Sequence, residues 1–185
     1  YYDQLPSNLR VYGASDYAVT DGGGDYTEHG IIGIDGQMNM YVIDWWYGQS
    51  TAEEWINAKC DLIIKHNPRA WFGESGVIRR ALEPFMLKLM QDRDATCKIY
   101  WLASIADKTT RARGIQGKAS MGKLRFPKKA AWKERLINQM LRFPAGKHDD
   151  AVDVLSLFGR GLEHINASKG KAWDKPLKPS MSYVV

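Results

Sequence analysis

Tight turns divide the N-terminal part of the chain into strands and leave no room for helices between them. Residues 8–20 alternate in polarity as a strand does. The Asp/Gly run at 21–25 and the Asp-Gly pair at 35–36 are strong turn signals. They separate this strand from two more, expected at 27–34 and 39–47. The segment therefore predicts an antiparallel meander, which excludes a doubly wound dinucleotide fold because that fold needs crossover helices.

The pattern then changes to alternating helices and strands. Thr51 is a candidate N-cap, with Glu54 three residues later completing a capping box. Residues 104–127 are rich in Gly, Lys and Arg and only weakly periodic, so we expect a flexible basic segment there. The order predicts an α/β fold with a mixed central sheet, three antiparallel strands then parallel ones, flanked by helices. The remaining expected elements are helices at 51–66, 77–92, 130–142 and 149–165, and strands at 70–73 and 98–102.

Size and composition indicate one soluble domain. The chain has 185 residues, 44% hydrophobic and 25% charged, which argues against disorder. We expect residues 1–166 to form the domain and 167–185, which are rich in Lys, Pro and Ser, to form a basic, flexible tail. No apolar run reaches the roughly 18 residues of a membrane span, and we expect no signal peptide. The chain starts without Met, so we expect it to be a piece of a longer protein.

The net charge and the cysteine positions limit which ligands and binding partners are expected. The chain carries 26 Lys and Arg against 21 Asp and Glu, a net charge of +5. This modest excess fits a polyanionic partner, although many basic proteins bind none. Cys60 and Cys97 are far apart and lack metal-ligand spacing, so a structural zinc site is not expected.

Two isolated carboxylates stand out on strands. Asp16 lies within the first strand, where aspartate is unfavourable and a buried carboxylate needs a partner or a metal. Glu74 follows the strand at 70–73, at the sheet edge where α/β sites collect. Each has an alternative explanation: Asp16 as an edge-strand residue bonded to backbone near the turn, and Glu74 as an acid favoured by a helix dipole.

Three more acids open the last helix. Asp150 and Asp153 are three residues apart and share a helix face. Asp149 or Asp150 is a candidate cap for the helix, but capping does not account for Asp153. We expect Asp149 to be the cap, beside the site. His148 is either a hydrogen-bond donor behind the site or simply the residue at which the chain enters the helix.

Together, Asp16, Glu74, Asp150 and Asp153 describe a converging carboxylate site. Such a cluster repels itself unless divalent cations neutralise it, and oxygen-only ligands suit Mg²⁺ or Mn²⁺. A pair of such ions catalyses phosphodiester cleavage in other proteins. Basic residues of the 104–127 segment would then hold the DNA backbone, unless that segment is only a solvated loop. The candidates are Lys108, Arg111, Arg113, Lys118 and Lys123.

Four motifs resemble the nuclease domain of the large terminase subunit of tailed bacteriophages. The opening strands, GASDYAVTDGGGDYTEHGIIGIDGQMNMYVIDWWYGQ, are similar to those of the family, in which the first strand carries the first catalytic aspartate, here Asp16. WFGESG is similar to the second acidic motif, with Glu74. KHDDAVDVLS resembles the third, HDDxxDAL, and departs from it at Val154, where the family usually has Ala. DKTTRARGIQ is similar to the family's Lys-x-x-Arg-Ala segment, which gives Lys108 and Arg111 DNA-contact roles.

The resemblance covers roughly residues 8–165 and implies an RNase H-like fold with two-metal nuclease chemistry. It implies cutting of concatemeric viral DNA when packaging starts and ends, in the host cytoplasm at the procapsid. The implied partners are double-stranded DNA, an N-terminal ATPase domain of the same protein, the portal and the small terminase subunit, with no membrane. The chain contains no GxxxxGK[ST] loop, so we expect no ATPase site in it.

Two alternatives remain open. A Holliday-junction resolvase or transposase-type nuclease has the same core, but junction specificity needs a dimer. A non-catalytic DNA-binding or motor-docking module would carry the same acids as caps and surface charges, and metal would neither bind nor matter.

Overall fold

A six-stranded mixed sheet forms the centre of the computed structural model, which describes residues 1–18, 26–104, 107–146 and 148–173. The strand order is β5-β4-β1-β2-β3-β6. The β1–β2 and β2–β3 pairs are antiparallel, whereas the β1–β4, β4–β5 and β3–β6 pairs are parallel. The predicted α/β class with a mixed sheet is therefore confirmed. The strands are β1 Arg10–Asp16, β2 Thr27–Ile34, β3 Met40–Gly48, β4 Trp71–Glu74, β5 Ile99–Leu102 and β6 Leu124–Arg125.

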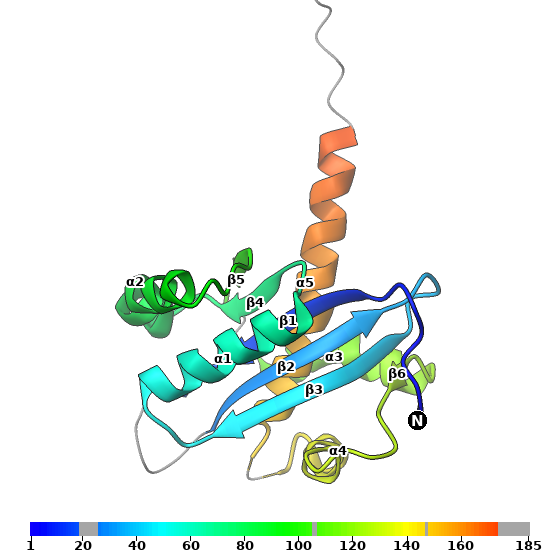
Figure 1. The fold of residues 1–185 in the computed structure, drawn as a ribbon. Helices are drawn as coiled ribbons and strands as arrows, with labels where there is room; N and C mark the ends of the chain where they lie inside the picture. Colours follow the sequence, from blue (N-terminus) through cyan, green and yellow to red (C-terminus); the bar gives the residue numbers. More distant parts are fainter. Residues whose placement is uncertain (19–25, 105–106, 147, 174–185) are drawn as a thin grey trace, which may run out of the picture.

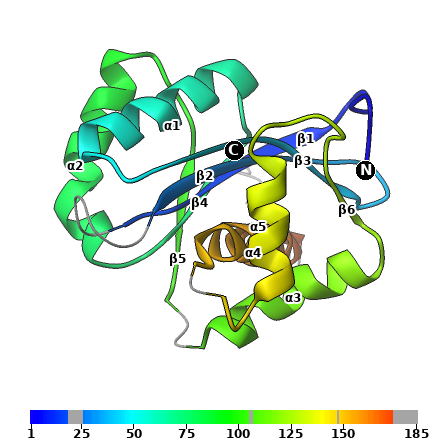
Figure 2. The same ribbon diagram turned by 90° about the horizontal axis from the view of Figure 1, so that it is seen from below.

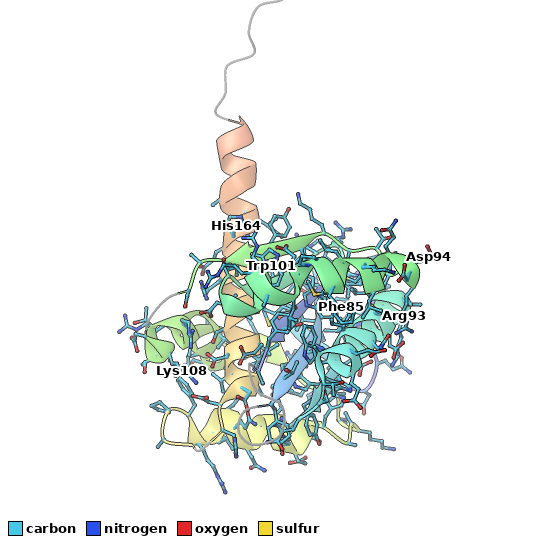
Figure 3. All side chains as sticks on the ribbon, turned by 90° about the vertical axis from the view of Figure 1, so that its left-hand side faces the viewer. Phe85, Arg93, Asp94, Trp101, Lys108 and His164 are labelled. Atoms are coloured by element: carbon cyan, nitrogen blue, oxygen red, sulfur yellow. The ribbon has the colours of Figure 1, made fainter. Side chains whose placement is uncertain are left out.

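Helices cover both faces of the sheet (Figures 1 and 2). Helices α1 (Ala52–His66) and α2 (Val77–Asp92) lie on one face. Helix α5 (Asp150–Trp173) crosses the other face, where α3 (Lys108–Ser120) and α4 (Lys133–Arg142) pack against it. Side chains fill the space between the layers, with Lys108 on α3 far from Arg93 and Asp94 at the end of α2 (Figure 3).

Each face of the sheet has its own hydrophobic core, and each core places a tryptophan over a glycine of the β1–β2 hairpin. On the α1 side, a Cβ built on Gly13 would lie 2.2 Å from the indole of Trp71. On the α5 side, a Cβ on Gly30 would lie 2.5 Å from the indole of Trp45. Both positions require glycine because an indole ring occupies the space that a Cβ would need.

Most expected elements are present within one to three residues of their predicted bounds. The predicted capping box of α1 is confirmed, because the Thr51 hydroxyl accepts from the Glu54 N–H while the Glu54 carboxylate accepts from the Thr51 N–H. The predicted turn at 21–25 lies outside the described residues. Within the described residues, no helix is both long and apolar enough to span a membrane.

Four elements differ from the sequence-based expectation. Strand β1 covers Arg10–Asp16 of the strand expected at 8–20, so Asp16 ends the strand. Much of the segment expected to be flexible and basic forms α3, which begins where the Asp107 carboxylate accepts from the N–H groups of Thr109 and Thr110. The short strand β6 was not predicted. Helix α5 continues to Trp173, past the expected end at residue 165. The division into a domain at 1–166 and a tail at 167–185 stays a prediction, because residues 174–185 lie outside the described part.

Candidate functional site

Two of the predicted acids lie at the same edge of the sheet. Asp16 is the last residue of β1 and Glu74 the last residue of β4. The two strands are parallel neighbours, with Ser15 opposite Gly73, so Asp16 and Glu74 occupy adjacent positions on strands about 4.8 Å apart. The sheet alone therefore brings these two carboxylates together.

The N-terminus of α5 adds the other two acids. Helix α5 packs across β1 and β2, and its first turn carries Asp150 and Asp153. Burial raises the pKa of Asp16 to about 8, and the negative charges of Asp153, Asp150 and Glu74 add to that rise. The four predicted acids thus lie within electrostatic reach of one another.

Cationic side chains from α3 lie among these carboxylates. The guanidinium of Arg111 bridges Glu74 at 3.1 Å and Asp153 at 3.0 Å. The ammonium of Lys108 lies 2.7 Å from Asp149 and 3.2 Å from Asp153. Arg111 is only 11% exposed and Lys108 is 51% exposed. Arg111 is therefore committed to the acid cluster, while Lys108 also faces solvent.

These cations only partly neutralise the cluster. Burial raises the pKa of Asp153 even though Arg111 and Lys108 lower it. Burial alone would lower the pKa of Lys108, but its bonds to Asp149 and Asp153 outweigh that effect and raise it. The cluster therefore still favours the uptake of positive charge.

A further buried acid was missed by the sequence analysis. Glu28 on β2 pairs directly with Asp16 on β1 and is fully buried. Its carboxylate accepts from the Trp45 indole N–H at 2.6 Å and pairs with Arg135 of α4 at 2.6 Å. Burial raises its pKa despite Arg135. The hairpin register would have revealed Glu28, because it places this residue opposite Asp16.

The entry to α5 is built differently from the expected cap. The backbone carbonyl of Asp149 accepts from the Asp153 N–H, which gives Asp149 the N-cap position. Its carboxylate, however, binds Lys108, and the N–H of Ala151 is bound by the side chain of Gln139 on α4. His148 packs edge-on against Tyr26 at the start of the helix.

The other predicted DNA-contact residues lie outside the cluster. Arg113 is exposed on α3, and Lys118 lies in the last turn of that helix. Lys123 donates to the backbone carbonyl of Gln37, in the turn between β2 and β3 at the opposite end of the strands from Asp16. The structure thus brings Lys108 and Arg111 to the acids, but not Lys123.

The acid cluster suits a divalent cation in donor type and charge. All four predicted ligands offer carboxylate oxygens, the donors that Mg²⁺ and Mn²⁺ prefer, and their mutual repulsion contributes to the raised pKa of Asp16. In the described part of the chain, no three acidic, histidine or cysteine side chains are arranged to hold one ion. Arg111 now bridges one oxygen of Glu74 and one of Asp153, so an ion at these carboxylates would compete with its guanidinium.

Solved structures of viral terminase nucleases have a similar fold. The human cytomegalovirus terminase nuclease domain, soaked with Mn and bound to an inhibitor, is 12% identical over 85% of this chain and 85% of that one, with a TM-score of 0.63. The large terminase nuclease of thermophilic phage G20c with bound zinc is 13% identical over 84% and 82%, with a TM-score of 0.59. This chain has the terminase nuclease fold. The predicted RNase H-like class is thereby confirmed.

The terminase nuclease fold makes up part of larger proteins as well. The large terminase of another thermophilic bacteriophage, in complex with ADP, is 12% identical over 88% of this chain but only 42% of its own length, with a TM-score of 0.58. No family model and no curated protein sequence matches the chain.

Proposed function

We propose that this chain is a Mg²⁺- or Mn²⁺-dependent endonuclease domain that cuts double-stranded viral DNA concatemers during genome packaging. The observation that carries the proposal is the meeting of Asp16, Glu74, Asp150 and Asp153 at one edge of a terminase nuclease fold. These acids come from β1, β4 and α5, and burial together with their mutual repulsion raises the pKa of Asp16 to about 8. Structural capping does not account for four acids converging from three elements.

Each residue of the cluster has a role in this proposal. Asp16, Glu74, Asp150 and Asp153 hold the metal ions. When bound, two such ions activate the attacking water and stabilise the leaving oxygen in phosphodiester hydrolysis. Lys108, half exposed at the rim, is placed to bind a phosphate oxygen of the DNA. His148 and Asp149 support the start of α5 and so fix the position of Asp150 and Asp153.

Arg111 acts within the cluster. It bridges Glu74 and Asp153 at about equal distances, so it holds these two carboxylates in place before metal binds. A guanidinium offers two parallel N–H groups to a phosphate, so Arg111 would also be able to bind the DNA backbone beside the acids. The DNA-contact role of Arg111 stays part of the proposal. Arg113, Lys118 and Lys123 are proposed as weaker, more distant contacts.

The proposed partners follow from the fold of the full terminases. The large terminase solved with ADP is more than twice as long as the region that it shares with this chain. We propose that an N-terminal ATPase domain accompanies this chain in its full-length protein, with the small terminase subunit and the portal as further partners. The proposed site of action is the host cytoplasm, at the procapsid, and no membrane is involved.

Incubation of the purified domain with supercoiled plasmid and Mg²⁺, Mn²⁺ or EDTA tests the proposal. We expect nicking and linearisation with metal and none with EDTA, and no cleavage by Asp16→Asn. Cleavage that persists in EDTA, or in Asp16→Asn, would contradict the metal site. A folded protein that binds DNA but cuts it with no metal would favour the motor-docking module.

The same assay separates the second nuclease class. A four-way DNA junction offered beside linear duplex of equal length reports on junction specificity. Preferential cutting of the junction by a dimer would favour a resolvase, whereas cutting of linear duplex by a monomer supports the terminase function.

A further inference from the structure

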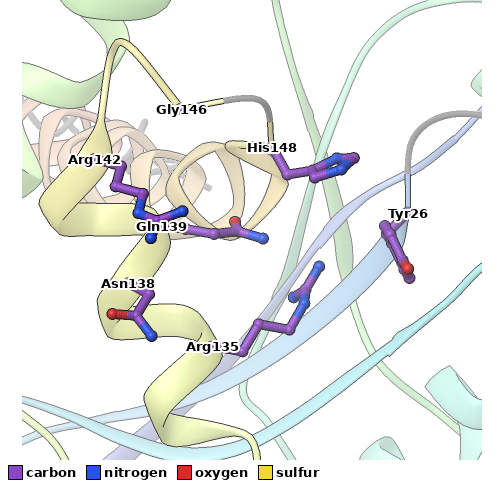
Figure 4. A pocket seen from close by; sticks show the side chains of 7 residues that line it. All are labelled: Tyr26, Arg135, Asn138, Gln139, Arg142, Gly146 and His148. Atoms are coloured by element: carbon purple, nitrogen blue, oxygen red, sulfur yellow. The ribbon is translucent and has the colours of Figure 1, made fainter.

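A cavity of about 300 Å³ borders the acid cluster. It lies between α4, the start of β2 and the loop that leads into α5 (Figure 4). None of the described residues that line it is acidic. Its side-chain lining consists of Tyr26, Arg135, Asn138, Gln139, Arg142 and His148.

Arg135 is held rigidly in the cavity wall. One of its terminal nitrogens pairs with the buried carboxylate of Glu28 at 2.6 Å. Its guanidinium carbon lies 4.1 Å from the ring centre of Tyr47 and 4.9 Å from that of Tyr26. A guanidinium has five N–H donors, so the Glu28 pair leaves others for a ligand. Because the side chain is already fixed, little conformational entropy is lost when it binds.

The other polar groups of the cavity are also able to donate hydrogen bonds. Gln139 uses its carbonyl oxygen to accept from the Ala151 N–H at 2.9 Å, which leaves its amide nitrogen to donate. Nδ1 of His148 is buried and has no hydrogen-bond partner among the described residues. Figure 4 shows the side chains of Arg135, Gln139 and His148 directed toward a common space, with Arg142 beside Gln139. A cavity lined by cationic and neutral donors, with no carboxylate among its described lining residues, matches an anion such as a phosphate group.

The cavity lies close enough to the acid cluster to hold a neighbouring phosphate of the same DNA strand. His148 is two residues from Asp150, a distance of at most about 7 Å along an extended chain. Successive nucleotides of one DNA strand rise by about 3.4 Å along the duplex axis. Because successive phosphates also rotate about the axis, they lie farther apart than this rise, and the separation corresponds to about one or two nucleotides.

We propose that this cavity is a DNA-phosphate subsite, formed by Arg135, Arg142, Gln139 and His148, that positions the backbone one or two nucleotides from the phosphate at the acid cluster. The inference rests on the proposed function, because it takes DNA as the substrate. It adds a contact from α4 and the start of α5 to those expected from Lys108. The two contacts come from different helices, and together they would restrict how the strand lies across the acids.

Arg142→Gln tests the subsite without disturbing the core. Arg142 is exposed and has no ion pair among the described residues, whereas a change at Arg135 would leave the buried charge of Glu28 unpaired. The measurement is fluorescence anisotropy of a short labelled DNA duplex in EDTA, over a range of salt concentrations. We expect Arg142→Gln to weaken binding about 5- to 10-fold at low salt and to reduce the slope of log K against log salt by about 0.9.

Matched variants separate the cavity from general charge. Arg80→Gln removes the same charge from an exposed position on α2, on the other face of the sheet, and is expected to leave binding and salt slope unchanged. Arg142→Lys keeps the charge and is expected to recover most of the affinity. Equal effects of Arg80→Gln and Arg142→Gln would overturn the subsite, because they would reflect net charge alone.

The outcomes also separate this proposal from the nuclease function. If wild-type protein cuts plasmid with Mn²⁺ while Arg142→Gln binds duplex as wild type does, the subsite is wrong and the nuclease function stands. If Arg142→Gln weakens binding with the reduced slope but no metal supports cleavage, the subsite stands and the nuclease function fails. Inorganic phosphate is the control for a free anion. Tight binding of it that Arg142→Gln abolishes, with DNA binding unchanged, would assign the cavity to a small anion and overturn the proposal.

Discussion

Two successive residue pairs of the β1–β2 hairpin face opposite sides of the sheet. One pair is neutral and hydrogen-bonded, and the other consists of two acids. Ser15 lies opposite His29, and Asp16 lies opposite Glu28. The first pair lies on the side of α1 and the second on the side of α5. A step of one residue along the strands therefore leads from a neutral hydrogen-bonded network, around Ser15 and His29, to the acid cluster around Asp16.

The Ser15–His29 pair is fully hydrogen-bonded. The indole N–H of Trp71 donates to the Ser15 hydroxyl at 2.7 Å, and that hydroxyl lies 2.8 Å from Nδ1 of His29. Nε2 of His29 lies 2.8 Å from the backbone carbonyl of Trp55. Burial lowers the pKa of His29 to about 3, so the ring is neutral and each side-chain polar group of this network has a partner.

The acids on the other side do not satisfy one another. The pKa of Asp16 is raised by burial and by the charges of three other carboxylates. A buried polar group with partners contributes to stability, whereas a group of like charges costs stability and is retained where function needs it. Under the proposed function, the α1 side of the sheet serves the fold and the α5 side serves the chemistry.

Removing one acid is expected to have the largest effect. In Asp16→Asn, Glu74→Gln or Asp153→Asn we expect cleavage to fall by about three orders of magnitude, because metal binding is lost. The melting temperature of Asp16→Asn is expected to hold or rise, because like-charge repulsion is relieved. Plasmid cleavage and thermal unfolding measure the two effects. Asp44→Asn, which removes a carboxylate from β3, is the control that should keep its activity.

Breaking the neutral network is expected to act on stability instead. Ser15→Ala leaves Nδ1 of His29 and the indole N–H of Trp71 without their shared partner, which costs about 2–3 kcal/mol of unfolding free energy. Urea unfolding measures it. Ser156→Ala is the matched control, because that buried hydroxyl bonds to a carbonyl of its own helix, Val152, at 2.7 Å. Equal losses in the two variants would show that the network adds nothing beyond an ordinary buried hydroxyl.

Metal binding is expected to stabilise the folded protein through the acid cluster. At a Mn²⁺ concentration about ten times the dissociation constant, we expect the unfolding free energy to rise by about 1.4 kcal/mol and the melting temperature by about 3–6 °C. The shift should be absent in Asp16→Asn and present in Ser15→Ala. A shift of the same size in Asp16→Asn would mean that the ion binds elsewhere.

The smallest expected effect concerns Asp44, an acid that is paired with Lys65 and His66. Burial alone would raise the pKa of Asp44, but hydrogen bonds from His66 and Lys65 outweigh it and lower the pKa to about 2. Because the folded pKa lies below the usual value of 3.8, the stabilisation is present above about pH 4 and is lost as the pH falls toward 2. With Lys65 67% exposed, we expect about 1 kcal/mol after solvent screening.

Urea unfolding of wild type and Asp44→Asn at pH 6 and pH 2 checks this sign. The two proteins should differ at pH 6 and converge at pH 2. A difference that grows as the pH falls would contradict the pairing of Asp44 with His66 and Lys65.

Much of the fold could be predicted from the sequence because its signals are local. The turn residues and alternating strands indicated the meander, and Thr51 with Glu54 indicated the start of α1. Helix α3 could not be predicted in this way, because Gly114 and Gly117 weaken its pattern and only Ala112 and Ile115 are buried. It is stabilised by the Asp107 cap and by packing on α5, and the second of these is tertiary.

The residues of the candidate site also differ in whether local sequence signals or tertiary packing reveal them. Asp16, Glu74, Asp150 and Asp153 were found because each conflicts with its local context. Glu28 and Arg135 were missed because their pairing links β2 to α4 across 107 residues of chain. The position of Arg111 between two acids likewise depends on how α3 packs, which no spacing in the sequence encodes.

The close contact between Trp71 and Gly13 opposes a shift in the register of β1. A slip of β1 against β2 by one residue would exchange the faces of Ser15 and Asp16, and of every other residue along the strand. If β4 keeps its place, the slip also brings a side chain to the position of Gly13 beneath Trp71, where a Cβ meets the indole at 2.2 Å. A chain with Asp16 on the wrong face therefore cannot close the core on the α1 side as the native chain does. The strand register that closes this core is therefore the same register that places Asp16 on the face of the acid cluster.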